Sequence, residues 1–240
     1  WKQKEKLKLQ KREMELVSRN AVWREKRRKL LSLPRYTLGE EIANAITHGL
    51  GAALAAVGAG LLLVHTQSDL LSLVSAGIYS ATMFLLYLVS TLYHSLAVSR
   101  TKKVFQVLDH CTIYLLIAGT YTPISLLCIG GNTGWLLVGI VWTAAVVGIV
   151  LNAVNMRRFR VISMVCYLAM GWCVLFFLPA LLQGIDSVSL ILLVTGGVLY
   201  TVGAVIYGIG RTVPYMHALW HVFCTAGSIF HYLVVYRICG

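Results

Sequence analysis

Charged side chains are scarce in this sequence. Only 12% of its 240 residues are Asp, Glu, Lys or Arg, whereas 58% are hydrophobic, and the mean hydropathy is +0.75. A soluble domain is typically about 25% charged and about 45–50% apolar. The shortage of charge therefore excludes an ordinary soluble domain and indicates an integral membrane protein.

Paired cysteine spacing is also missing. The six cysteines are scattered, and most lie inside apolar runs, where a thiol behaves as a small hydrophobic group. No disulfide framework is therefore predicted. We expect no signal peptide either, because the first apolar run is too long and begins too far into the chain.

The charge that is present lies mostly at the start of the chain. Residues 1–35 hold 13 of the 21 Lys and Arg residues and 4 of the 9 acids, which is a net charge of +9. We predict that residues 1–37 form a basic cytoplasmic segment, either a surface helix or a flexible tail. Next to a membrane domain, such a segment favours an anionic lipid leaflet as its partner, and we expect no nucleic acid. The sequence leaves the protein partners unknown.

Seven apolar runs follow, each close to the roughly 20 residues that a bilayer-spanning helix needs. They cover residues 42–64, 70–98, 104–129, 134–154, 161–182, 188–209 and 215–236. The connections are short and rich in turn-forming residues. The predicted fold class is all-α: residues 38–240 form one integral membrane domain, a seven-helix bundle.

Basic residues are missing from alternate loops. Three of the six loops contain neither Lys nor Arg, whereas the other three are residues 100–103, residues 157–160 and the loop with Arg211. Lys and Arg concentrate in short cytoplasmic loops. This pattern predicts a multi-pass protein of the cell (plasma) membrane with its N-terminus in the cytoplasm and its C-terminus outside.

The few polar residues inside the runs gather near the predicted cytoplasmic side. His217 and His221 are four residues apart, so they share one face of the last helix. His94 lies near the cytoplasmic end of the second run, and Ser90 shares its face one turn away. Asp109, the only acid inside any run, lies one to two turns into the third run. At 1.5 Å per residue, these groups fall within a slab of roughly 10 Å.

This set of residues is typical of a metal site. Three histidines from two helices match a zinc site with three protein ligands and an open fourth position. We predict that His94, His217 and His221 bind a metal and that the metal is zinc, while imidazole also suits copper, iron and nickel. Asp109 would orient a metal-bound water and accept its proton, and Ser90 would hydrogen-bond a ligand or an oxyanion. The alternative for each histidine is hydrogen-bonded packing.

The remaining residues of interest have less specific expectations. His48 is either a packing residue or a hydrogen-bond partner of the metal site. His110 points away from Asp109 and is expected to pack or to bridge helices. His231 would be structural or line a cavity, His65 would be solvated, and Pro123 would kink the third helix.

These residues lie in stretches that resemble the haemolysin III family, bacterial members of the progestin and adipoQ receptor superfamily. The stretches are residues 40–49, 90–94, 108–110 with the following run 113–123, and 217–221. The resemblance implies that His94, His217 and His221 hold zinc near the cytoplasmic face. It also implies that Asp109 binds the zinc-bound water and that Ser90 belongs to the site. The superfamily is similar to the alkaline ceramidases, which suggests hydrolysis of a lipid amide in a bacterial cell membrane.

Three functions therefore stay open, and whether the protein is an enzyme is one of the questions. The first is a zinc hydrolase of a lipid amide or ester, and the second is a non-catalytic regulator of membrane lipid state with a structural zinc. The third, a pore-forming haemolysin, is favoured only by the family name, because no amphipathic pore-forming segment is visible. Membrane lipids are the expected partners in all three.

Overall fold

The computed structural model describes residues 2–209 and 213–240, and these residues form helices joined by short turns. In chain order the elements are α1 (Lys2–Leu31), α2 (Leu38–His65), α3 (Leu70–Ser95), α4 (Arg100–Pro123), η1 (Ile124–Ile129), α5 (Gly131–Asn155), α6 (Arg160–Trp172), η2 (Cys173–Phe177), α7 (Leu178–Gly184), α8 (Ser187–Ile209) and α9 (Met216–Cys239). Arg211, one of the loop cations in the orientation argument, lies outside the described residues.

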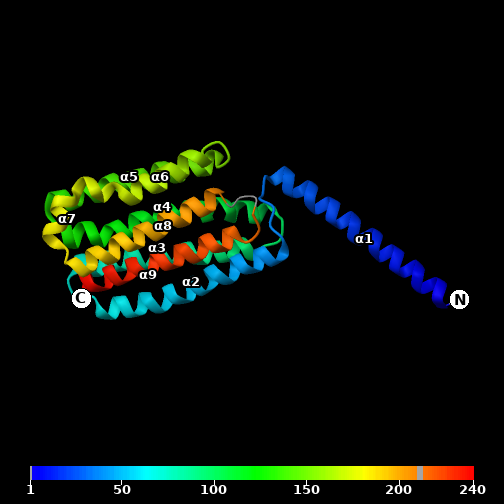
Figure 1. Cartoon of the computed structure of the whole chain (residues 1–240), viewed down its shortest axis with the longest axis horizontal. Helices are drawn as coiled ribbons and strands as arrows, with labels where there is room; N and C mark the ends of the chain where they lie inside the picture. Colours follow the sequence, from blue (N-terminus) through cyan, green and yellow to red (C-terminus); the bar gives the residue numbers. More distant parts are fainter. Residues whose placement is uncertain (1, 210–212) are drawn as a thin grey trace.

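The elements from α2 to α9 run side by side as one bundle, and α1 projects from one end of it (Figure 1). Seven segments of the described chain are long and apolar enough to cross a membrane, which confirms the predicted seven-helix membrane fold. We call the end that carries α1, with the neighbouring loops 96–99 and 156–159, the basic end. The side of the membrane on which it lies stays a prediction.

Two of the seven spans are not regular α-helices. The third span changes at Pro123 from the α4 helix to the π-helical turn η1, because proline has no N–H to continue the ladder. The fifth span, predicted as one helix, is divided into α6, the 3₁₀ turn η2 and α7, which begins around Pro179. Tyr121 of α4 supports this break: its hydroxyl donates to Gly171 O (2.9 Å) and accepts from Val174 N–H (3.0 Å).

Local sequence signals define how α1 joins the bundle. Ser32 follows α1 in the left-handed conformation (φ 55°), and Leu33 N–H bonds back to Arg28 O at 3.1 Å, which closes the helix end. Arg157 donates to the Ser32 hydroxyl at 2.9 Å, and Leu33 is buried. The far part of α1 is exposed to solvent along its length.

The start of α2 is fixed equally closely. Thr37 and Glu40 form a capping box, in which the Thr37 hydroxyl accepts from Glu40 N–H and the Glu40 carboxylate accepts from Thr37 N–H. The second Glu40 oxygen accepts from Tyr215 N–H at 3.2 Å, immediately before α9 begins. This contact ties the start of α2 to the start of α9, so both helices enter the bundle at the same level.

Close packing of α2 against α3 depends on small residues. A Cβ atom at Gly51 would lie 2.5 Å from the ring of Tyr87, whose side chain is fully buried and hydrogen-bonded to Ser228. A Cβ at Gly60, nine residues further along α2, would meet nothing within 4 Å. Only the first of these glycines is therefore required by a neighbouring helix.

We expect Gly51→Ala to lower the free energy of unfolding by about 1–3 kcal/mol, the usual effect of overpacking a filled interior. Gly60→Ala is the matched control on the same helix, and it should leave stability unchanged or raise it, since alanine is the better helix former. Thermal unfolding in detergent compares the two variants. Equal effects at both positions would contradict the described α2–α3 contact.

Candidate metal centre

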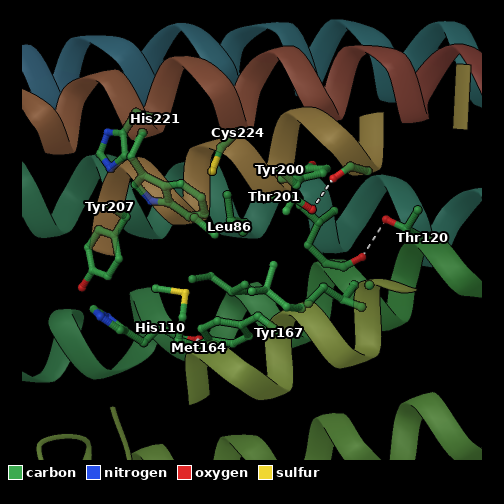
Figure 2. A pocket seen from close by; sticks show the side chains of 18 of the residues that line it. Leu86, His110, Thr120, Met164, Tyr167, Tyr200, Thr201, Tyr207, His221 and Cys224 are labelled. Carbon is green, nitrogen blue, oxygen red and sulfur yellow. Dashed lines mark hydrogen bonds between the residues drawn. The ribbon is translucent and has the colours of Figure 1, made fainter. Parts of the chain in front are cut away.

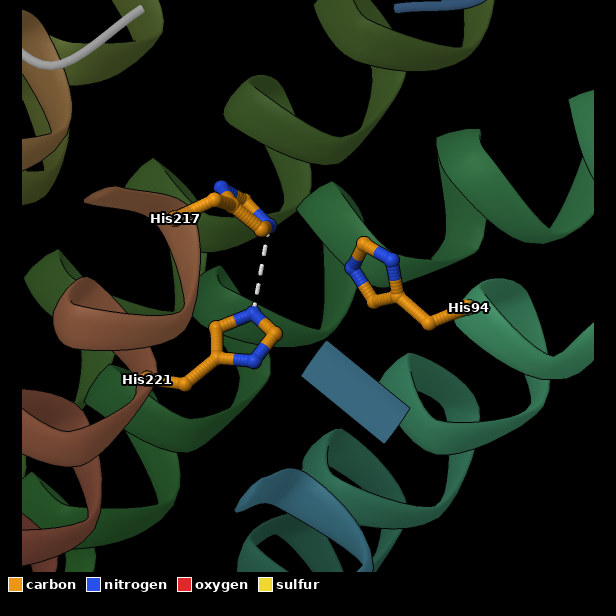
Figure 3. Close-up of side chains that lie close together, drawn as sticks. All are labelled: His94, His217 and His221. Carbon is orange, nitrogen blue, oxygen red and sulfur yellow. Dashed lines mark hydrogen bonds between the residues drawn. The ribbon is translucent and has the colours of Figure 1, made fainter. Parts of the chain in front are cut away.

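Three histidines from α3 and α9 meet at the basic end of the bundle. His94 lies in the last turn of α3, and His217 and His221 lie on one face in the first turns of α9. One ring nitrogen of each lies within 4.8 Å of the others, and the Nε2 atoms of His217 and His221 are 3.1 Å apart (Figure 3). The structure therefore brings together the three residues that the sequence predicts as metal ligands, and the cluster could hold a metal ion.

The hydrogen bonds of two of these rings define where their lone pairs point. His94 Nδ1 lies 2.8 Å from the Glu41 carboxylate, and His221 Nδ1 lies 3.2 Å from the backbone oxygen of Asn44. Both oxygens accept hydrogen bonds, so both Nδ1 atoms carry the proton and both Nε2 atoms carry a lone pair.

The environment of these lone pairs fits a bound cation. His94 and His221 are 2% and 1% exposed, and His94 Nε2 has no hydrogen-bond partner among the described residues. Buried polar atoms without partners are uncommon, because each one costs free energy. Asn44 Oδ1, Tyr93 Oη and His217 Nδ1 lack partners in the same way. A metal ion with its bound water is an occupant that would satisfy this donor set.

Glu41 and Lys102 belong to this site, and sequence reasoning missed both. The second Glu41 oxygen pairs with Lys102 Nζ at 2.9 Å. Lys102 is only 3% exposed and also donates to the backbone oxygens of Tyr93 and Leu96, at the end of α3. The result is a chain of contacts from buried Lys102 through partly exposed Glu41 to buried His94, the arrangement by which carboxylates orient metal-bound histidines.

No sequence signal distinguished these two residues. In the sequence, Lys102 is one of several loop cations, and Glu41 directly follows another acid, Glu40, in the first turn of α2. Their pairing depends on how the α3–α4 turn lies against α2, which neither segment encodes alone.

The remaining histidines occupy distinct positions. His48 stacks on His221 with ring centroids 3.4 Å apart, and both its ring nitrogens lack partners among the described residues. His110 donates from Nδ1 to Gln106 O of its own helix, so this nitrogen does not bridge two helices. His231 contacts Leu193 O on α8 and lines a cavity, as expected. His65 is exposed and stacks on a tyrosine ring.

The two residues predicted to be catalytic lie near the cluster but outside the three-histidine set. Asp109 lines the same cavity as His217 and His221, and its carboxylate accepts no hydrogen bond among the described residues and lies 3.7 Å from His110 Nδ1. Ser90 is 1% exposed, one turn before His94, and its hydroxyl lacks a partner within the described part of the chain. Their catalytic roles stay predictions.

The histidine cluster lies at one end of a cavity inside the bundle. From His217 and His221 the cavity passes Leu86 and Cys224 and reaches Thr120 and Tyr200 in the membrane interior (Figure 2). Its walls are mostly apolar. A second cavity adjoins it, because the two share Thr120, Tyr121, Gly171, Trp172, Gly197 and His231.

Tyr36 covers the cluster at the basic end. Its ring centroid lies 5.2 Å from that of His217 and 5.7 Å from that of His94. Burial raises the pKa of Tyr36, so the phenol stays neutral. The segment that joins α1 to α2 therefore covers the site at the basic end of the bundle.

The fold and the site together define a class: a seven-helix membrane protein with a buried three-histidine cluster at one end of an apolar cavity. Comparison with known families agrees, because the family described as "Haemolysin-III related" matches residues 36–232. The chain belongs to the haemolysin III family, which confirms the resemblance that its motifs predict.

Individual relatives support this assignment over most of the chain. Hemolysin-3 of Bacillus cereus is 42% identical over 198 residues, which cover 82% of this chain and 90% of that protein. The hemolysin-3 homolog of Bacillus subtilis (strain 168) is 39% identical over 206 residues, covering 85% and 96%. The human monocyte to macrophage differentiation factor is 30% identical over 213 residues, covering 84% and 85%.

The contacts that join Lys102, Glu41 and His94 lead to a prediction about metal affinity. In Glu41→Gln a neutral amide replaces the carboxylate that orients the His94 ring, so the affinity for zinc should fall by about 10- to 100-fold. Competition with a chromophoric chelator measures this affinity. Glu25→Gln, the same change at an acid on α1, is the control and should leave the affinity unaltered.

The ion pair between Lys102 and Glu41 can also be tested through the stability of the fold. Lys102→Met leaves the Glu41 carboxylate without its buried cation, so the free energy of unfolding should fall by on the order of 3 kcal/mol. Adding Glu41→Gln to that variant should restore part of the loss, because no unpaired charge then remains. Simple additivity of the two changes would contradict the pairing.

Proposed function

We propose that this protein is an integral membrane zinc hydrolase that cleaves the amide or ester bond of a lipid. One observation carries the proposal: the lone pairs of buried imidazoles face one another at the end of an apolar cavity within the membrane-spanning bundle. Metal ligands suited to hydrolysis and space for a hydrocarbon chain thus share one chamber.

Each residue of the site has a distinct task in this proposal. His94, His217 and His221 would hold the zinc ion, with Glu41 and Asn44 O orienting two of the rings. Zinc, when bound, supplies an activated water near neutral pH and polarises a carbonyl group. Asp109 would accept a proton from the attacking water and return it to the leaving amine or alcohol. Ser90 would donate a hydrogen bond to the carbonyl oxygen as negative charge develops there.

The cavity supports a lipid as substrate. Leu86, Ile113, Leu116 and Ile117 line it beyond the site, and the second cavity prolongs it between η1, α7 and α8. An acyl chain could lie there while its carbonyl group reaches the histidines. The names of the Bacillus relatives refer to haemolysis, and a pore-forming role for this chain is an alternative that rests on those names.

The proposal is tested by metal content and turnover measured together on detergent-purified protein. We expect about one zinc per chain, lost in a His94→Ala/His217→Ala/His221→Ala variant, and hydrolysis of at least one member of a broad lipid amide and ester panel. Asp109→Asn should keep the zinc and lose about 10²- to 10⁴-fold in turnover, the usual contribution of a general base. Asp186→Asn, at an exposed acid far along the chain, is the control.

Other results would favour the alternative functions. Stoichiometric zinc without turnover over the whole panel would support a lipid-responsive regulator in which zinc only joins α3 to α9. Dye leakage from reconstituted vesicles would support the pore. A folded wild-type protein that binds no metal would contradict both the hydrolase and the structural-zinc alternatives.

We further propose that the basic end faces the cytoplasm of a bacterial cell and that α1 binds the anionic leaflet there. The alternation of loop charge and the Bacillus relatives support the first part. The high positive charge of α1 supports the second. Since α1 projects from the bundle in Figure 1, docking would require it to swing about residues 32–36.

Trp23, which is 56% exposed on α1, reports this docking. Its fluorescence, isolated by subtraction of a Trp23→Phe variant, should shift to the blue and resist acrylamide quenching in nanodiscs that contain phosphatidylglycerol. Phosphatidylcholine nanodiscs or high salt should abolish the effect, because exposed charges are screened beyond about 10 Å at 0.1 M salt. Identical quenching in both lipids would overturn the proposal.

A further inference from the structure

The cavity extends well beyond the residues assigned to hydrolysis, and its inner part contains one further histidine. It runs along α9 from His221 toward Tyr200 (Figure 2). His231 follows ten residues after His221 on that helix, about 15 Å further into the bundle. It lines both cavities and is only half-buried. An ionisable side chain at this depth in a membrane usually has a function.

The hydrogen bonds of His231 leave one acceptor free. Its Nε2 atom lies 3.1 Å from the backbone oxygen of Leu193 on α8, and since a carbonyl oxygen only accepts, Nε2 carries the proton. Among the described residues, Nδ1 makes no hydrogen bond and no carboxylate pairs with the ring. A buried charge without a counter-charge is costly, so the ring is an uncharged imidazole whose Nδ1 offers a lone pair.

Two glycines make room for this ring and for its neighbour. A Cβ atom at Gly196 of α8 would lie 2.2 Å from Cδ2 of His231, and one at Gly227 of α9 would lie 2.8 Å from the ring of Tyr200. Each helix therefore lacks a side chain where the ring of the other helix lies. The two ring centroids are 5.4 Å apart, and the Tyr200 hydroxyl is hydrogen-bonded to Ser228 on α9. This packing holds His231 between the helices, beside the cavity.

The hydroxyl groups around His231 have already used their hydrogens. Thr120 and Thr201 donate to backbone oxygens of their own helices, and Tyr121 donates to a backbone oxygen of α6. All three residues line the cavity. What they and His231 Nδ1 can still do is accept, so an occupant has to supply the donor. On a hydrocarbon chain, a hydroxyl group can donate, whereas the oxygen of a ketone or an ester cannot.

The depth of His231 defines where such a hydroxyl would stand on a chain. An extended hydrocarbon chain advances roughly 1.3 Å per carbon, because its C–C bonds are about 1.5 Å long and alternate in direction. A distance of about 15 Å along α9 thus corresponds to about twelve carbons from a carbonyl group at the histidine cluster.

We propose that His231 binds a hydroxyl group in the middle of the hydrocarbon chain of the cavity's ligand, about twelve carbons from the group at the histidine cluster. The hydroxyl donates a hydrogen bond to Nδ1, while the rest of the chain contacts the apolar walls. This inference deepens the proposed function, on which it rests for a lipid with its carbonyl group at the histidines. The substrate class becomes a lipid with a hydroxylated acyl chain.

Equilibrium binding of fatty acids to the full chain in phosphatidylcholine nanodiscs tests the inference, with empty nanodiscs as the baseline for partitioning. A fatty acid has no bond that the proposed hydrolase would cleave. We expect 12-hydroxyoctadecanoic acid to bind about 3- to 10-fold more tightly than octadecanoic acid, the effect of one neutral hydrogen bond. The acids 6-hydroxyoctadecanoic and 12-oxooctadecanoic should show no such gain, because the first carries its hydroxyl elsewhere and the second has no donor.

Three variants connect this preference to His231. His231→Phe keeps a ring but removes the acceptor, so it should abolish the preference and leave octadecanoic acid bound as before. Gly196→Ala should reduce the preference by displacing the ring. Gly208→Ala is the control on the same helix, since a Cβ there would meet nothing within 4 Å. Equal affinities for the 12-hydroxy and unsubstituted acids, an equal gain for the 12-oxo acid, or a preference that survives His231→Phe would overturn the inference.

The outcome is independent of whether the protein is a hydrolase. A preference for the 12-hydroxy acid without turnover of any amide or ester would reject the proposed hydrolase and keep this site. Turnover of unsubstituted lipid amides together with equal fatty acid affinities would reject only the hydroxyl site.

Discussion

An imidazole ring buried in an apolar bundle has two nitrogens that need partners, and no water from the bilayer can supply them. Two of the three histidines at the basic end meet this constraint on one side of the ring through protein oxygens: a carboxylate for His94 and a backbone oxygen for His221. In the other direction their nitrogens face one another, and a cation is the occupant that satisfies them together. The geometry of α2, α3 and α9 at this end follows from that requirement.

The carboxylate that orients His94 creates a second constraint, because it is a charge with little access to solvent. Lys102 neutralises it and at the same time uses its remaining donors on the end of α3. The turn between α3 and α4 is therefore held by the same contacts that orient a metal ligand. Disorder in this turn would therefore change the geometry of the histidine cluster, although the turn does not line the cavity.

The cavity divides into parts of different chemistry along its length. Imidazoles, Asp109 and Tyr207 lie at the basic end, while the remainder is lined mostly by aliphatic and aromatic side chains. The proposed lipid substrate rests on this apolar space beside the histidines. Tyr36, in the segment that joins α1 to α2, lies over the histidine cluster at the basic end.

Much of this organisation could be predicted from the sequence because it depends on spacing along single helices. Seven apolar runs define seven spans, the four-residue interval between His217 and His221 defines a shared face, and motif spacing identifies the family. The position of His94 at the same level follows from helix rise and orientation. The break in the fifth span was missed, because Tyr121, which supports it, comes from another helix.

Only the tertiary structure decided which side chains meet across helices. The rotation of one helix relative to its neighbour is set by packing at positions such as Gly51 and Tyr87, and no periodicity in the sequence records it. That rotation pairs Glu41 with Lys102 and stacks His48 on His221. The sequence by itself determined the membrane fold and the three histidines, whereas the partners that orient these histidines arose from contacts between segments far apart in the chain.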